Sequence, residues 1–118
     1  MNRIIKFRAW HECSNRMLKP DGLDFHTYKN EVAIYVKTNG PHGYINTYAF
    51  DECILMQFTG LPDKNGKDIY EGDILKGGIY KAYEVEWDSE ENGWNINNHA
   101  RLFDVIGNIY ENPELLNN

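Results

Sequence analysis

Long apolar runs and a disulfide framework are both missing from this sequence. No apolar stretch approaches the ~18 residues that a membrane-spanning helix needs. Lys6 and Arg8 interrupt the only apolar stretch near the N-terminus, so we expect no signal peptide. The two cysteines, Cys13 and Cys53, are too few for a disulfide framework in a chain with enough core to fold without one. These absences predict a reduced, cytoplasmic protein.

Catalytic and cofactor motifs are missing as well. No glycine-rich turn leads into a helix that would cradle a phosphate, and no serine lies in a nucleophile elbow. The four histidines lack metal-ligand spacing, except for His11 beside Cys13. Two ligands on one strand face are too few for zinc unless distant residues join them. We therefore expect no enzymatic activity, no cofactor and no metal.

The composition indicates one globular domain, residues 1–118, built mainly from β-strands. The chain is 42% hydrophobic and 25% charged, ordinary values for a soluble protein. Eight tyrosines, five phenylalanines and three tryptophans are residues that favour pleated, half-buried surfaces. No segment has a helical apolar stripe longer than two turns, whereas short alternating runs separated by turn residues recur.

Positive charge is concentrated at the start of the chain. The net charge is −6, yet residues 1–19 contain five basic residues and one acidic residue, a local net of +4. The rest contains seven basic and seventeen acidic residues, a net of −10. This asymmetry is typical of a nucleic-acid-facing edge. The alternative, which we favour, is that the basic first strand packs beside the acidic remainder or across a subunit interface from it.

The N-terminal part, residues 1–53, predicts several short strands. Residues 4–10 alternate like a strand, and residues 17–18 begin a second one that Pro20 ends. Residues 32–36 contain enough β-branched side chains to predict a third strand, and residues 44–50 are a candidate for a fourth strand.

The central segment, residues 54–76, has the densest turn chemistry. Residues 54–59 predict a strand that ends at Gly60. The Asp63 side chain is expected to cap the turn that follows, in which Gly66 adopts positive φ. A second tight turn contains Gly72, again at positive φ, and Asp73 is expected to hold it together.

The remaining segment, residues 72–110, predicts a small antiparallel barrel of the SH3 type. Its expected strands are residues 74–76, 79–87, 94–96 and 103–106, separated by turns. The side chains expected to face inward are Ile74, Val85, Trp87, Ile96, Val105 and Ile109. Trp87 and Trp94 are expected to pair across strands within the core. Asn112 before Pro113 predicts an N-cap and a short C-terminal helical turn.

The chain resembles the YopX family of small phage and prophage proteins. The resemblance rests on residues 4–17, 54–76 and 103–116, about half of the chain, and residues 18–50 form a variable segment. It implies a mainly β fold with an SH3-like barrel, a phage or prophage origin in a bacterial host cell, and no known catalysis. It assigns no functional residues.

Two groups of residues are candidates for binding. The basic first strand has an aromatic neighbour, Trp10, which we expect to be exposed, and the central segment is rich in carboxylates. The candidates are Arg8, Trp10, Arg16, Asp63, Tyr70, Glu71 and Asp73. A calcium-loop pattern fails in the central segment because Lys67 stands where an oxygen ligand is needed, so its carboxylates are expected to hold turns.

Three functions remain open on the sequence alone. A non-enzymatic protein-binding or adaptor domain that also self-associates, with a host or phage protein as its partner, is the leading hypothesis. The alternative is a nucleic-acid-binding accessory protein that uses Arg3, Lys6, Arg8, Trp10 and Arg16. A small metal-dependent hydrolase built on the central carboxylates is the weakest of the three.

Overall fold

The protein, described here by a computed structural model, divides into two compact units. The structure describes residues 5–117, apart from the side chains of residues 28 and 97–99. Unit 2 comprises residues 7–56, and unit 1 comprises residues 5–6 and 57–117. The fold is mainly β and antiparallel, as the sequence predicts.

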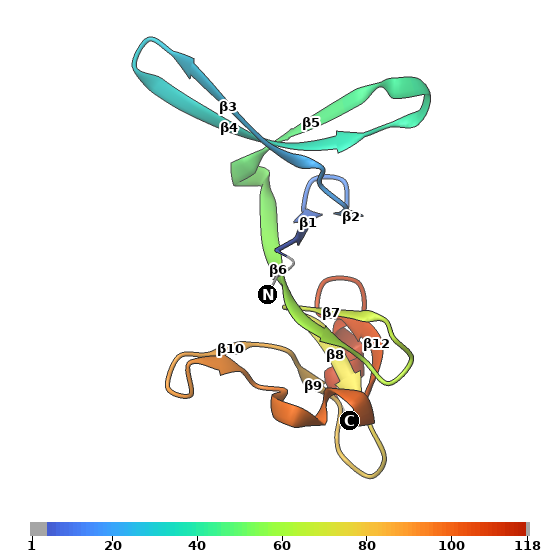
Figure 1. The fold of residues 1–118 in the computed structure, drawn as a ribbon. Helices are drawn as coiled ribbons and strands as arrows, with labels where there is room; N and C mark the ends of the chain where they lie inside the picture. The colour runs from blue at the N-terminus through green and yellow to red at the C-terminus, as the bar shows by residue number, and fades with distance from the viewer. Residues whose placement is uncertain (1–4, 118) are drawn as a thin grey trace. The chain divides into compact units, whose positions relative to one another are not determined.

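Unit 2 is built from short strands and two long hairpins (Figure 1). Its strands are β1 (Phe7–His11), β2 (Arg16–Leu18), β3 (Gly22–Tyr28), β4 (Glu31–Asn39), β5 (Ile45–Ala49) and the start of β6 (Cys53–Pro62). Two 3-10 helices, η1 (Pro41–Gly43) and η2 (Phe50–Glu52), flank β5. The expected second, third and fourth strands are therefore present, and β3 is an additional strand.

Strand β4 is the centre of a three-stranded sheet of order β3-β4-β5. It pairs with β3 from Glu31 to Lys37 and with β5 only from Tyr35 to Asn39. A separate core lies beneath it, formed by Ala9, Leu18 and Val36 with partly buried neighbours from β5, η2 and β6.

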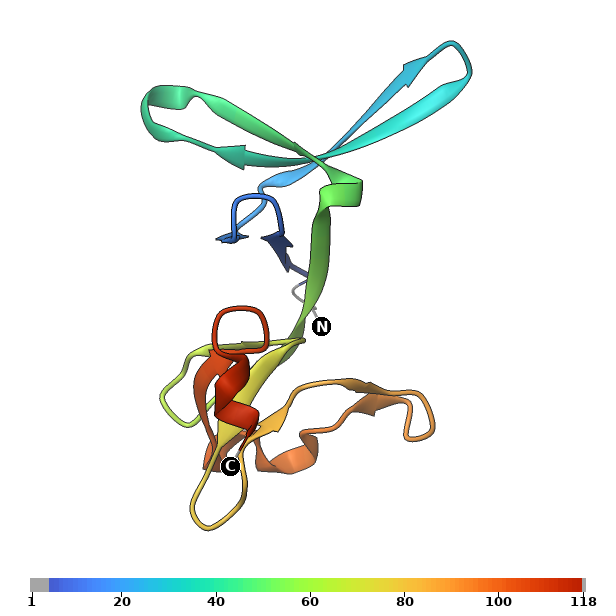
Figure 2. The same cartoon turned by 180° about the vertical axis from the view of Figure 1, so that it is seen from behind.

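Unit 1 contains the second half of β6 and the C-terminal strands. These are β7 (Asp68–Tyr70), β8 (Asp73–Lys76), β9 (Tyr83–Glu84), β10 (Trp87–Asp88), β11 (Gly93–Trp94) and β12 (Asp104–Asn108). The strands β12, β8 and β9 form an open antiparallel sheet in this unit, which Figure 2 shows from behind. Its core consists of Ile69, Leu75, Val85, Ile96, Ala100 and Phe103.

Every helix in the described residues is a short 3-10 helix. Besides η1 and η2, these are η3 (Asn97–Leu102) and η4 (Pro113–Leu116). None of them is long and apolar enough to cross a membrane. The C-terminal helical turn is confirmed, with Pro113 in its first turn, but Asn112 makes no side-chain cap bond to it. Instead, the Asn112 Oδ1 accepts a hydrogen bond from the Asn108 N–H at 3.3 Å.

The predicted strand at residues 79–87 is only partly present. Tyr83 and Glu84 pair with β8 and the Val85 N–H donates to the Asp73 carbonyl at 2.8 Å, whereas Ile79 lies in a loop and is 95% exposed. The reason is that β8 has only four residues, so a longer partner would have no backbone groups to pair with.

The predicted inward face of the barrel is partly wrong. Ile74, Val85 and Ile96 are buried and Val105 packs against the core, but Trp87 is 49% exposed. Trp87 and Trp94 do pair across strands, with ring centroids 5.2 Å apart and nearly perpendicular planes. They lie on the hairpin β10–β11, whose strands have two residues each. So short a hairpin cannot bury both tryptophans in a core.

The predicted end of the central strand at Gly60 is also wrong. Strand β6 continues to Pro62, and Gly60 at φ +86° lies where its register against β7 shifts. The residue therefore makes a bulge within the strand, a use of positive φ that glycine tolerates.

Candidate functional site

The carboxylate of Asp63 holds the central turn together. Its Oδ1 accepts hydrogen bonds from the N–H groups of Asn65 and Lys67, at 2.8 and 2.9 Å. Its Oδ2 accepts one from the N–H of Val105 at 3.0 Å. Burial acts to raise the pKa of Asp63, but these three hydrogen bonds and the charge of Lys67 outweigh it and hold the pKa below its usual value. The predicted cap is confirmed.

The other central carboxylates are likewise used within unit 1. The Asp73 Oδ2 accepts from the Tyr70 N–H at 2.8 Å, so Asp73 holds the second turn as predicted. The Glu71 Oε1 accepts from the Gln57 N–H at 3.3 Å. Among the residues that the structure describes, these carboxylates form no cluster of three ligand atoms for a cation.

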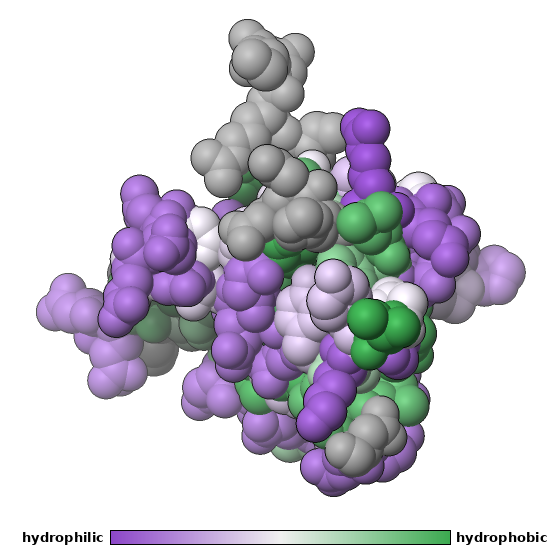
Figure 3. All heavy atoms as spheres, turned by 90° about the horizontal axis from the view of Figure 1, so that it is seen from below, coloured by the Kyte–Doolittle hydropathy of each residue, from purple (hydrophilic) through white to green (hydrophobic). Residues whose placement is uncertain are grey.

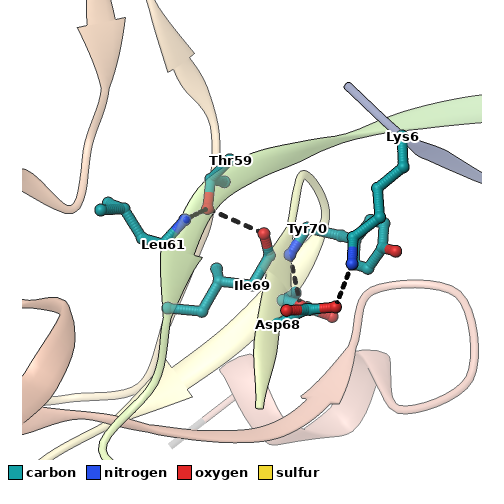
Figure 4. Close-up of polar contacts among 7 residues, drawn as sticks. Lys6, Thr59, Leu61, Asp68, Ile69 and Tyr70 are labelled. Carbon is teal, nitrogen blue, oxygen red and sulfur yellow. Dashed lines mark hydrogen bonds and ion pairs between the residues drawn. The ribbon is translucent and has the colours of Figure 1, made fainter. Parts of the chain in front are cut away.

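The basic first strand contributes to the same network (Figure 4). The Lys6 Nζ lies 2.6 Å from the Asp68 Oδ2 and above the ring of Phe58, and the contact with Asp68 raises the pKa of Lys6. Nearby, the Thr59 hydroxyl donates to the Ile69 carbonyl and accepts from the Leu61 N–H, which holds the bulge of β6. Lys6 thus packs beside acidic residues of its own chain.

The N-terminal binding candidates do not form one exposed surface. Arg16 is exposed and Arg8 is half-buried, whereas Trp10 is only 8% exposed. The expectation of an exposed Trp10 is therefore wrong, because the consecutive residues Ala9, Trp10 and His11 are all buried, so both faces of β1 are covered at this end. Arg3 lies outside the described residues.

Burial and neighbouring charge shift three further pKa values. Burial, followed by the charges of Glu52, Cys13 and Asp51, raises the pKa of the Cys53 thiol. Burial also raises the pKa of Tyr83, and burial with the nearby Glu86 raises that of Glu84. A raised pKa keeps Cys53 protonated, which argues against a nucleophilic role for it.

One edge of β4 is the most evident site for a partner. Residues 31–34 pair with β3 on one side only, since β5 leaves the sheet at Ala49, opposite Tyr35. No strand among residues 5–117 pairs with the other edge of this segment. Backbone groups of alternate residues point to opposite edges of a strand, so half of these residues direct N–H and C=O groups to the open edge.

The β3–β4 hairpin also has an exposed apolar face. Val36 lies on this face in the core, and the face continues outward through Ile34 to Val32, which is 61% exposed. Phe25, paired with Ile34, lies on the same face and is 65% exposed. The face therefore begins in the core and becomes accessible toward the end of the hairpin.

A hollow of about 390 Å³ lies beside the open edge. It is lined by Val32, Ala33, Ile34, Tyr35, Ala49, Phe50 and Asp51. Most of these lining residues have apolar or aromatic side chains, and the one charged residue, Asp51, is acidic. The hollow thus occupies the position that β5 would take if it continued along β4.

None of these surface residues was singled out from the sequence. A signal was present in residues 23–27, where Leu23 and Phe25 alternate with polar residues and predict a half-buried strand. The residues that follow, Lys29 and Asn30, both adopt positive φ, as a two-residue hairpin turn requires.

Exposed hydrophobic residues are not confined to unit 2. Figure 3 shows a face on which hydrophobic side chains lie among hydrophilic ones. In unit 1 the large hydrophobic residues most open to solvent are Ile79, Tyr80, Trp87, Leu102 and Ile106. Ile106 and Trp87 lie on β12 and β10, which are themselves edge strands, whereas at the β3–β4 hairpin an open edge adjoins a hollow.

Comparison with known proteins places the chain among others of similar fold. The model of a family described as YopX protein matches residues 6–117. The crystal structure of protein EF1440 from Enterococcus faecalis is similar to this structure, with a TM-score of 0.59 and 29% sequence identity. That similarity covers 98% of this chain and 99% of that one. No curated protein matches the chain.

Proposed function

Since this chain belongs to the YopX protein family, we propose that it is a non-enzymatic protein-binding or adaptor domain of phage or prophage origin. The observation that supports this function is the open edge of β4 beside an apolar hollow in unit 2. An edge with free backbone groups and adjacent side-chain pockets is how proteins bind extended peptides by strand addition. We further propose that the protein acts in the cytoplasm of the bacterial host cell.

The partner in this proposal is an extended segment of another protein. Its backbone pairs with residues 31–34, and its alternate side chains contact Val32 and fill the hollow toward Phe50. A lysine or arginine at one position of the segment faces Asp51, the charged residue of the lining. The segment therefore alternates apolar residues and includes at least one basic residue.

The expected affinity is modest. Each backbone hydrogen bond adds about 0.5–1.5 kcal/mol, and full burial of a side chain such as Val or Phe adds about 1.5–3 kcal/mol. Ordering the peptide offsets part of this gain, so a dissociation constant on the order of micromolar is expected for so short an edge. A weak contact suits an adaptor that releases its partner.

Nucleic-acid binding through the basic first strand is the alternative. Exposed Arg16 supports it, but Lys6 is engaged by Asp68 and Trp10 is buried, which leaves few groups for phosphate or base contacts. Counterion release needs several basic residues on one face. We therefore favour a protein partner.

The proposal also includes self-association and an SH3-type barrel in unit 1. Complementary charge between the first nineteen residues and the remainder supports a symmetric oligomer. The sheet β12-β8-β9, the hairpin β10–β11 and one common core support the barrel, because short antiparallel strands around a single core are how such barrels are built.

Selection from a displayed library of random peptides tests the adaptor function. Enriched peptides should alternate apolar residues, include a lysine or arginine, and bind with about micromolar affinity. Val32→Glu should abolish their binding by placing a charge on the apolar face. Ile79→Glu is the matched control, because Ile79 is an equally apolar, 95% exposed residue of unit 1.

Two results would overturn the adaptor function. Enriched peptides that bind Val32→Glu as well as the parent would place the binding site elsewhere. A parent that enriches no peptide but forms an oligomer that Val32→Glu disrupts would assign the edge to a second copy of the chain.

A further inference from the structure

Three potential metal ligands converge at one end of unit 2. His11 is the last residue of β1, Cys13 lies in the turn between β1 and β2, and Glu52 is the last residue of η2. A ring nitrogen of His11, the Cys13 sulfur and a Glu52 carboxylate oxygen all lie within 4.8 Å of one another. Glu52 is thus the distant residue that joins the His11 and Cys13 pair, across 41 positions of sequence.

The spacing of the His11 and Glu52 ligand atoms fits a tetrahedral ion. The His11 Nε2 lies 3.2 Å from the Glu52 Oε2. In a tetrahedral zinc site with metal–ligand bonds of about 2.1 Å, nitrogen and oxygen ligands lie ~3.4 Å apart. An ion can therefore lie between these two atoms with little movement of either side chain.

We propose that His11, Cys13 and Glu52 bind a zinc ion, through Nε2, Sγ and a carboxylate oxygen. Imidazole, thiolate and carboxylate are together the ligands of zinc, whereas calcium and magnesium prefer oxygen alone. Binding releases the thiol proton to solvent. Cys13 and Glu52 are exposed, so a water molecule completes the fourth position.

Neighbouring groups already orient the histidine for this role. The His11 Nδ1 lies 2.6 Å from the Ser14 Oγ, and when Nδ1 donates its proton to this hydroxyl, the Nε2 lone pair is available to the ion. The His11 side chain is only 9% exposed, and its ring packs edge-on against Tyr48 at 4.8 Å between centroids. A backbone hydrogen bond from Glu12 to Glu52 holds the turn beside η2.

The ion would join two segments of unit 2 that lie near the beginning and the end of its sequence. It connects the β1–β2 turn to η2, the element that leads from the β3-β4-β5 sheet into β6. Because the ion binds the folded unit and not the unfolded chain, it stabilises unit 2 by mass action. This role does not depend on peptide binding at β4, which uses other residues.

Metal titration of the reduced, metal-free full chain tests the site. Zinc, measured by competition with a chromogenic chelator, should bind at one ion per chain. Cobalt in its place should give the sulfur-to-metal charge-transfer absorption of a thiolate ligand and the intense visible bands of tetrahedral coordination. Cys13→Ser should remove the charge-transfer band, and both Cys13→Ser and Glu52→Gln should weaken zinc binding more than about a hundredfold.

Matched variants separate ligands from bystanders. Cys53→Ser and Asp51→Asn should bind zinc like the parent, since neither residue belongs to the cluster. Ser14→Ala should weaken binding by about 10–100-fold through loss of the histidine orientation. Circular dichroism without metal confirms that each variant is folded. Absence of stoichiometric zinc binding, or a cobalt spectrum without a thiolate band, would overturn the site, as would equal losses in Cys13→Ser and Cys53→Ser.

Discussion

Substitution of Asp63 should destabilise unit 1 more than substitution of any turn carboxylate that caps only its own loop. Asp63 is 4% exposed and accepts three backbone hydrogen bonds, two within its turn and one from Val105 on β12. The contact with Val105 joins segments 42 positions apart, so its loss loosens the attachment of β12 to the central turn.

The magnitude follows from these contacts. Asp63→Asn retains one amide oxygen for the two turn N–H groups, but it directs an NH₂ group at the Val105 N–H. Losing that charge-assisted hydrogen bond should cost about 1.5–3 kcal/mol of unfolding free energy. Asp63→Ala removes both acceptor oxygens and all three hydrogen bonds, and since the turn N–H groups can reach water, its cost should be about 3–5 kcal/mol.

The pH dependence distinguishes this mechanism from simple loss of packing. The folded-state pKa of Asp63 lies below its unfolded value of ~3.9. Its carboxylate therefore stabilises the fold above that unfolded value, and the contribution is lost as pH falls through the folded pKa. The stability difference between the parent and Asp63→Asn should be full at pH ~7 and should shrink below pH ~4.

Urea unfolding, followed separately by tryptophan fluorescence and circular dichroism, measures these differences. Asp88→Asn is the matched control, because the Asp88 Oδ1 caps only the local N–H groups of Glu90 and Glu91. An amide oxygen can take over that cap, so the control should lose less than ~1 kcal/mol. Equal losses in Asp63→Asn and Asp88→Asn at neutral pH would refute the argument, and so would a loss in Asp63→Asn that persists unchanged in acid.

Two further predictions concern backbone strain and assembly. Gly66→Val or Gly72→Val should each cost about 1–3 kcal/mol, because both glycines hold positive φ, near +85°, whereas Gly22→Val at an ordinary strand position should cost little. Unchanged melting of either turn variant would mean that the backbone strain is absent. Sedimentation at micromolar concentration should detect an oligomer, and weakening of it by salt would indicate charge pairing. A single monomeric species in low and moderate salt would exclude self-association.

Turn chemistry could be predicted because its causes are local. The roles predicted for Asp63, Gly66, Gly72 and Asp73 lie within a few residues of their own positions, and the structure confirms each, whereas the distant bond from Val105 to Asp63 was not predicted. The strand at residues 79–87 is only partly present for a non-local reason. Its alternation is real, but pairing requires a neighbour, and β8 pairs only with Tyr83 and Glu84 and accepts one further hydrogen bond from Val85.

The open edge of β4 also depends on a neighbouring strand, so the sequence alone could not predict it. The sequence predicts a strand at residues 32–36, and β4 runs from Glu31 to Asn39. The sequence of that strand does not indicate with which of its residues β5 begins and ends its pairing. The edge is left open because η2 turns the chain away at Phe50, after Ala49 has paired with Tyr35. A binding edge thus depends on where two neighbouring strands end relative to each other. Only their pairing register shows this.

The His11, Cys13 and Glu52 cluster extends this reasoning from backbone to side chains. From the sequence, only His11 and Cys13 have the spacing of metal ligands. Two ligands alone are too few for a zinc site, so the sequence argues against a metal. The third ligand comes from η2, brought close because β1 and the start of β6 belong to one sheet and Glu12 bonds to the Glu52 carbonyl. Ligand atoms separated by 41 residues meet only if both strands pair in the right register. Neither segment alone therefore predicts the site. Loss of zinc binding in Glu52→Gln, with His11 and Cys13 intact, would demonstrate that dependence directly.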